Sequence, residues 1–224
     1  MKEPVAKVFA ILAKDILTEL RTREIITAIL VFALLTIVIF HFAFDPSDGS
    51  INLAAPGVLW VALVFAGVLG LNRLFAIEKQ NSCLEGLIMC PVDSTLIYWG
   101  KMCASFLFMF AVAIVVTPIF LALLNFSLFL PHLIIVIVLA TVGFAAVGTL
   151  FSALAMNTKA RDIMLPILML PVLVPIMIAG VKSTALVLEG QPLADSFIWI
   201  QIMVIFDVIY LIAATLIFES AIEQ

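Results

Sequence analysis

Asp207 is the one acidic residue well inside the long apolar stretches of this chain. It lies within an apolar run over residues 197–218, and Tyr210 follows it by about one helical turn. A carboxyl group at that depth in a membrane-spanning segment is costly and marks a candidate functional site. Two interpretations stay open: Asp207 takes part in proton coupling, or it is a neutral carboxyl group hydrogen-bonded to a neighbouring helix.

The two histidines, His41 and His132, fall at the ends of apolar runs, where an imidazole could ligate haem iron or a metal. Isolated histidines at such positions more often lie at the membrane interface without a ligand. The chain has no H-E-x-x-H helix, no nucleophile elbow and no zinc-type cysteine spacing. We therefore expect no metal, no directly bound cofactor and no catalytic residue, so the chain is predicted not to be an enzyme.

The longest polar interruption after the N-terminal region covers residues 78–101. Ser82 and Glu85 have the spacing of a capping box, which predicts a short helix that begins at Cys83. Pro91 cannot donate a backbone hydrogen bond and disfavours helix in the residue before it, so the helix should end there. We interpret this segment as a cytoplasmic docking element.

The predicted short helix is amphipathic, because Leu84, Leu87 and Ile88 share one face at helical spacing. Such a helix, held at the membrane surface between two spans, suits a groove on a soluble partner. The chain has no phosphate-binding loop, since Gly180 to Ser183 lack the earlier glycine of that motif. If transport is driven by ATP, the nucleotide must be bound by another chain.

The composition, with 65% hydrophobic and 12% charged residues, exceeds what a soluble core of this size can bury. About 20 apolar residues are needed to cross a bilayer as a helix. Six segments qualify and predict an all-α membrane protein: residues 25–44, 53–75, 102–124, 133–156, 163–181 and 197–218.

The basic residues indicate the orientation, since Lys and Arg near span ends stay on the cytoplasmic side. All of the 11 Lys and Arg residues except Lys182 fall on the side that carries the N-terminus. Both termini are therefore expected in the cytoplasm. The net charge of -4 gives no reason to expect nucleic-acid binding.

Residues 1–24 are expected to form an amphipathic interfacial helix ahead of a six-span domain over residues 25–224. Its apolar face consists of Val5, Val8, Phe9, Leu12, Ile16 and Leu20, and Lys7, Lys14 and Arg21 lie opposite. Such a helix lies in the membrane interface, where its basic face could meet anionic headgroups or a partner protein.

Two further patterns concern helix packing. Small residues recur every four positions in two spans, which favours close helix contact within the bundle or between two copies. They are Ala62, Ala66 and Gly70 in one span, and Thr141, Ala145, Thr149 and Ala153 in the other. Pro166, Pro171 and Pro175 predict a kink in the fifth span, which is either a hinge or a static bend.

The polar segment, with its E-x-x-x-x-x-L-E-x-L pattern, a proline and then Gly100-Lys101 before a span, resembles the loop of ABC-2 type exporter permeases. The strings APGVLWVALVFAGVLGLNR (residues 55–73) and LPILMLPVLVPIMIAG (residues 165–180) resemble the CcmB family of haem exporter permeases in bacterial cytochrome c maturation. The resemblance covers nearly the whole chain.

The resemblance implies a multi-pass protein of the bacterial inner membrane that pairs with a cytosolic ATPase, protein A. It also implies a haem-handling protein C, a small protein D and a periplasmic haem chaperone E, whose haem-loaded form is released at the expense of ATP. Haem is the implied substrate. The ATPase contact is carried onto Ser82, Glu85, Leu87, Ile88 and Pro91, with Glu78 and Arg73 as tethers.

Two copies per complex are expected, because six spans are half of what a transporter with paired ATPases uses. Two other functions stay open at this point. One is an ABC-2 exporter of another amphiphile, such as a lipid, drug or polysaccharide. The other is a membrane scaffold that transports nothing and recruits partners.

Overall fold

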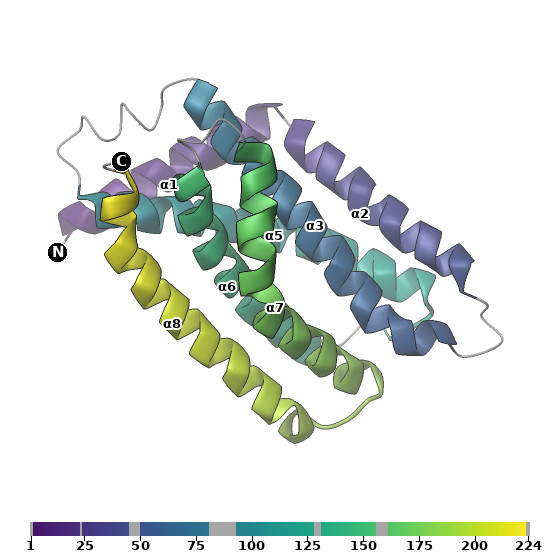
Figure 1. Cartoon of the computed structure of the whole chain (residues 1–224). Coiled ribbons are helices and arrows are strands. Elements are labelled where there is room, and N and C mark those ends of the chain that lie inside the picture. Colours follow the sequence, from purple (N-terminus) through teal and green to yellow (C-terminus); the bar gives the residue numbers. More distant parts are fainter. Residues whose placement is uncertain are drawn as a thin grey trace.

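A computed structural model of the chain is built from helices (Figure 1). The structure describes residues 2–22, 24–44, 50–80, 93–127, 131–155 and 161–222, and no strand occurs among them. The elements are α1 (Lys2–Thr22), α2 (Glu24–Ala43), α3 (Ser50–Gln80), α5 (Ser94–Leu123), α6 (Pro131–Ala155), α7 (Arg161–Leu188), the short 3-10 helix η2 (Leu193–Ser196) and α8 (Phe197–Ile222). The predicted all-α fold is confirmed.

Six of the described helices, α2, α3, α5, α6, α7 and α8, are long and apolar enough to cross a membrane, so six spans are confirmed. Two boundaries differ clearly from the prediction, and one is the end of the α7 segment, which reaches Leu188 instead of residue 181. The apolar segment of α5 starts at Ser94, whereas the sequence placed the start of this span at residue 102. The charge of Lys101 suggested a span end, but this side chain is only 1% exposed and lies within the helix bundle.

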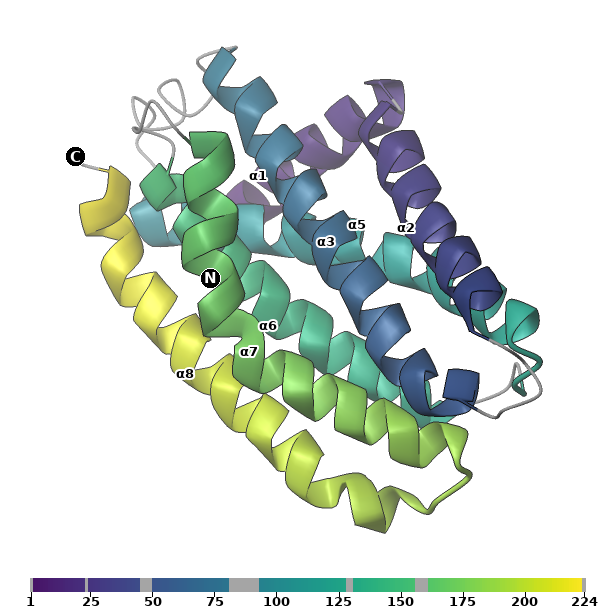
Figure 2. The same cartoon turned by 45° about the vertical axis from the view of Figure 1, so that its right-hand side comes forward.

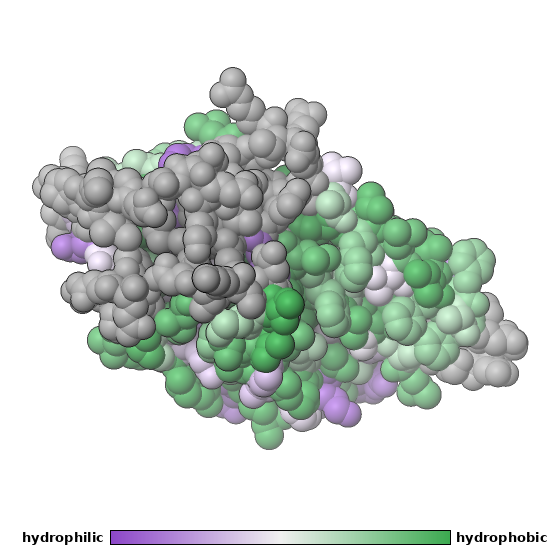
Figure 3. Space-filling view, turned by 45° about the horizontal axis from the view of Figure 1, so that its top comes forward, coloured by the Kyte–Doolittle hydropathy of each residue, from purple (hydrophilic) through white to green (hydrophobic). Residues whose placement is uncertain are grey.

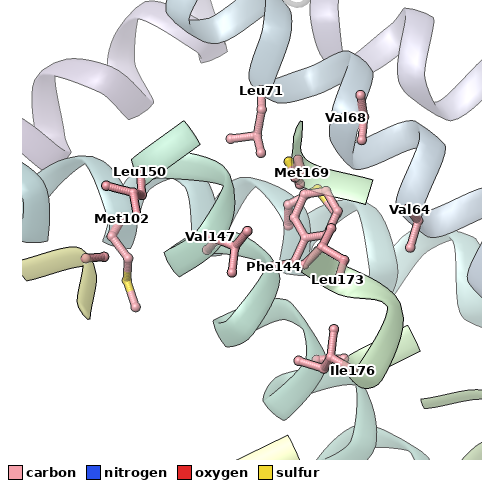
Figure 4. Packing of buried hydrophobic residues seen from close by; sticks show 14 of the residues in the cluster. Val64, Val68, Leu71, Met102, Phe144, Val147, Leu150, Met169, Leu173 and Ile176 are labelled. Atoms are coloured by element: carbon pink, nitrogen blue, oxygen red, sulfur yellow. The ribbon is translucent and has the colours of Figure 1, made fainter. Parts of the chain in front are cut away.

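Helix α6 lies at the centre of the bundle, and α2 lies at its edge. In the apolar segment of α6, 72% of the residues are buried, against 17% in that of α2. Figure 4 shows the main core, to which α3, α6 and α7 contribute Leu71, Phe144 and Met169. A second cluster, which includes Ile29 and Phe120, joins α2 to α3 and α5.

The small residues of α3 and α6 are used for packing inside the chain. Ala62, Ala66, Ala145 and Thr149 are all fully buried. A methyl group added at Gly70 would lie 2.9 Å from Cδ1 of Ile29, so this glycine lets α2 approach α3 closely. The alternative that these faces join two copies is therefore wrong, because neighbouring helices of the same chain already cover them.

Helix α7 changes direction partway along its length (Figure 2). It contains Pro166, Pro171 and Pro175, and each proline removes one hydrogen bond from the helix interior. The predicted kink is confirmed. A hinge would also require the bend to change, so the hinge stays a prediction.

One end of the bundle gathers α1, the end of α3, the start of α5 and the end of α8 (Figures 1 and 2). Away from this end the surface is largely hydrophobic. In Figure 3, hydrophobic residues cover most of the right-hand side, where α2 exposes Leu35, Ile39 and Phe42. A surface of this kind suits contact with lipid chains.

Candidate functional site

The predicted ATPase-contact residues fall mostly outside the part of the chain that the structure describes. These residues, all within 81–92, are Ser82, Glu85, Leu87, Ile88 and Pro91. Arg73 and Glu78 belong to the last turns of α3, and their side chains are outside the described part as well. The contact therefore stays a prediction, and the geometry of this region comes from the residues that follow it on α5.

The first turns of α5 are attached to α6 and α8. Tyr98 is fully buried, and its hydroxyl donates a hydrogen bond of 3.4 Å to the carbonyl of Ala146 on α6. The ring of Tyr98 lies 5.2 Å, between centroids, from that of Phe218 on α8. Two turns further along, the hydroxyl of Thr149 donates to that of Ser105 over 3.3 Å. The start of α5 is thus fixed on two sides.

On a third side, α5 is joined to α1 by a buried ion pair. The ammonium of Lys101 lies 2.9 Å from Oδ2 and 3.2 Å from Oδ1 of Asp15. The side chains are only 1% and 4% exposed. Lys14, which is 40% exposed, also lies 3.2 Å from Oδ1 of Asp15. A buried charge is stable only when it is compensated, so this pair fixes the position of α1 along α5.

Gly100, directly before Lys101, allows the two helices to come this close. A methyl group added at Gly100 would lie 2.8 Å from Cγ2 and 2.9 Å from Cβ of Ile11 on α1. Distances of that size are shorter than van der Waals contact, so any larger residue would push α1 away. In this chain the Gly-Lys pair before the span thus has a structural role: the glycine admits α1 and the lysine binds it.

The face that α1 turns toward α5 lies at one edge of the apolar face that the sequence indicates, where Val8 and Leu12 are half-buried. Val5 and Phe9, on that apolar face, are 69% and 67% exposed, whereas Ile11 and Asp15 are each 5% exposed. The exposed part of the apolar face stays open to the predicted contact with lipid, and a narrow face contacts the bundle. The sequence reasoning missed Ile11 and Asp15. An acid at the border between the basic and the apolar face was the available signal.

Asp207 of α8 points into the bundle. It is 5% exposed, and a methyl group added at Gly143 of α6 would collide with its Oδ1 and with Cδ1 of Ile176 on α7. Neither carboxyl oxygen has a hydrogen-bond partner among the described residues. Tyr210 instead packs its ring against Phe206, 4.4 Å between centroids. The expected hydrogen bond to a neighbouring helix is therefore not seen among the described residues.

The two histidines lie on different helices and at their ends. His41 is in the last turn of α2, beside the ring of Phe42, and its Nδ1 is buried without a partner among the described residues. His132 is the second residue of α6. In the described part of the chain no three His, Cys, Asp or Glu residues are grouped so that they could hold a metal ion. Haem contact by either histidine stays a prediction.

A cavity of about 200 Å³ opens between α5 and α6. Its lining is almost entirely apolar and includes Ile114, Pro118 and Ile137, while the hydroxyl of Thr117 is buried there without a partner among the described residues. Sites for small molecules usually have volumes of roughly 300–1,000 Å³. This cavity is therefore too small to enclose a drug-sized ligand.

The sequence matches the family model described as CcmB protein over residues 6–224. It is similar to a heme exporter protein B of Pseudomonas aeruginosa, with 27% identity over 172 residues, which cover 76% of this chain and 77% of that protein. A heme exporter protein B of Bradyrhizobium diazoefficiens is 27% identical over 182 residues, covering 81% and 82%. One from Escherichia coli K12 is 32% identical over 73 residues, covering 33% of each chain.

Proposed function

This chain belongs to the CcmB protein family, and from that premise we propose that it is the membrane permease subunit of a haem exporter in cytochrome c maturation. The observation that carries the proposal is the family match over residues 6–224, which includes all six spans. The name heme exporter protein B of its relatives favours haem over another amphiphile. It also favours a permease over a scaffold that transports nothing.

We propose that a separate cytosolic ATPase, protein A, drives this subunit through the segment at residues 78–101. The chain itself has no phosphate-binding loop. Supporting the proposal, helix α5, which begins at Ser94 within this segment, is held by three others: α1 through Asp15, α6 through Thr149 and α8 through Phe218. A push on the start of α5 would therefore reach α1, α6 and α8 together.

In this proposal, ATP hydrolysis by protein A leads to release of the haem-loaded periplasmic chaperone, protein E, from a complex with proteins C and D. Haem itself would then be handled mainly by protein C. Both termini and residues 78–101 lie on the cytoplasmic side in this arrangement, in the bacterial inner membrane.

Two copies of the subunit would act with a pair of ATPases. Because the small-residue faces of α3 and α6 are already buried, the second copy must contact residues that are exposed in one chain. The kink of α7 is the candidate hinge of the cycle. Pro171 and Pro175 are exposed, so a change of bend there would not have to break the core first.

The proposal is tested in a deletion strain of a bacterium that needs this gene. Loss of c-type cytochromes with b-type cytochromes retained, restored by the full chain, is the expected result. Purification of the tagged chain should also recover an ATPase subunit. Loss of both cytochrome types, or normal c-type cytochromes in the deletion strain, would contradict the assignment.

A further inference from the structure

Asp207 is a buried titratable group that the proposed function does not use. Its carboxyl group is 95% buried on α8, since only 5% of the residue is exposed. It faces Gly143 of α6, and Ile176 of α7 reaches the same point. No donor among the described residues reaches either of its oxygens. An ionised carboxylate would be costly in this position, because nothing nearby compensates its charge.

Among the described residues, the surrounding helices offer no cation beside the carboxyl group. The described titratable side chains on the helices packed against or containing this site are His132, Lys182, Tyr210, Tyr98, Lys101 and Cys103. His132 is about 16 Å from Gly143 along α6, and Lys182 is exposed about 9 Å beyond Ile176 along α7. Tyr210 packs on Phe206, and Lys101 is paired with Asp15.

The residues of α5 and η2 are also placed away from Asp207. Tyr98 contacts α8 at Phe218, about 16 Å along that helix from Asp207. Lys101 and Cys103 follow Tyr98 on α5. Asp195 of η2 is exposed at the other end of α8. The site is therefore an acid among apolar side chains and helix backbone.

A neutral carboxylic acid needs only one acceptor, and a helix can supply it. Each backbone carbonyl has two lone pairs, of which the helix uses one. Gly143 has no side chain, so this is the point on α6 where a side chain of α8 reaches the backbone directly. A buried carboxyl group that packs against a glycine is unusual. This contact is explained if the carboxyl group is protonated and can act as a donor.

We propose that Asp207 is a proton-binding site, whose neutral carboxylic acid can stay buried against the α6 backbone at Gly143 and thereby keeps α8 packed on α6. Loss of the proton to water leaves a carboxylate that no donor among the described residues reaches, so the contact opens. Ile176 lies in the same contact and directly follows Pro175. Protonation of Asp207 would therefore be coupled to the bend of α7.

Infrared spectroscopy of the full chain in lipid nanodiscs tests the proposal directly. A neutral carboxylic acid has a C=O stretching band, separate from that of carboxylates, which shifts in D₂O. The band should be present in the wild type at pH 7, absent in Asp207→Asn and unchanged in Glu189→Gln, a control at an exposed carboxylate. No band in the wild type, or a band that persists in Asp207→Asn, overturns the proposal.

Two further measurements cover the case in which Asp207→Asn does not accumulate. Carboxyl-labelled ¹³C-aspartate should shift the band in the wild type itself, and an unshifted band would contradict the assignment. The Tm of the wild type should fall as the pH rises, since only the unfolded chain can release the proton freely. Where Asp207→Asn can be purified, its Tm should stay level over the same range, and a parallel fall in both proteins would exclude Asp207 as the cause.

Discussion

The carboxylate of Asp15 and the ammonium of Lys101, 86 residues apart in the chain, lie 2.9 Å from each other and are almost completely buried. No local sequence pattern joins them. This pair attaches the N-terminal helix to the span that follows the predicted ATPase contact. It makes the N-terminal helix part of the bundle, in addition to its contact with lipid.

Replacing Asp15 should destabilise the protein more than replacing Lys101. Asp15→Asn leaves the ammonium of Lys101 buried without its carboxylate, and should cost about 3–5 kcal/mol, the range for a broken buried pair. Lys101→Met should cost less, because Lys14 still lies 3.2 Å from Asp15. Thermal unfolding in detergent or nanodiscs measures both.

The matched control for these variants is Lys14→Met. Lys14 is 40% exposed, so its contribution should be in the range of about 0–1 kcal/mol for surface pairs. The double variant Asp15→Leu with Lys101→Met should be more stable than Asp15→Asn alone, since no charge is then left buried. Equal losses in all three single variants would contradict the pairing seen here.

Gly100→Ala should weaken the attachment of α1 because the new methyl group would lie 2.8 Å from Cγ2 of Ile11. We expect a loss of about 1–3 kcal/mol, as for other overpacked contacts, and partial recovery when Ile11→Ala is added. Gly57→Ala in α3 is the control, since nothing lies within 4 Å of the added methyl group. It should be neutral or stabilising by up to about 1 kcal/mol. A harmless Gly100→Ala would show that the helices are further apart than described.

Glu85→Ala and Leu87→Asp should impair the coupling to the ATPase. The first removes one half of the predicted capping box, and the second puts a charge on the predicted apolar face. Both variants should insert normally, recover less ATPase on purification and lower the yield of c-type cytochromes. Glu189→Ala, exposed beyond α7, should change neither. Wild-type coupling in both loop variants would remove the docking assignment.

Pro171→Ala and Pro175→Ala should straighten α7 by restoring helix hydrogen bonds. If the kink is a hinge, these variants should accumulate to at least wild-type levels while the yield of c-type cytochromes falls. Heme staining against the amount of this subunit in membranes measures the ratio. An unchanged ratio would mean that the bend only shapes the packing.

The six spans could be predicted because each depends on a local property, an apolar run of about 20 residues. The start of α5 could not, because the charge of Lys101 resembles a span end until its distant partner is known. The orientation of Asp207 was equally hidden, since α8 is apolar on all sides and has no periodicity to show which side faces the bundle.

The site shows the same division. The kink of α7 follows from its prolines, which act on their own helix. The contact between Gly143 and Asp207 depends on how α6 crosses α8, and neither residue alone indicates it. Likewise, Gly100 belongs to a sequence pattern of the family. Its structural role, to let Ile11 of α1 approach α5, depends on the packing of two helices and cannot be predicted from that pattern.

The buried position of Lys101 also sets an order for membrane insertion. Asp15 is synthesised 86 residues before Lys101. We expect the lysine to enter the bundle at low cost only if the N-terminal helix already places Asp15 at the membrane surface. We therefore expect the N-terminal helix to assist the insertion of α5. A tag or truncation that displaces it should leave α5 poorly inserted, even though no residue of α5 has changed.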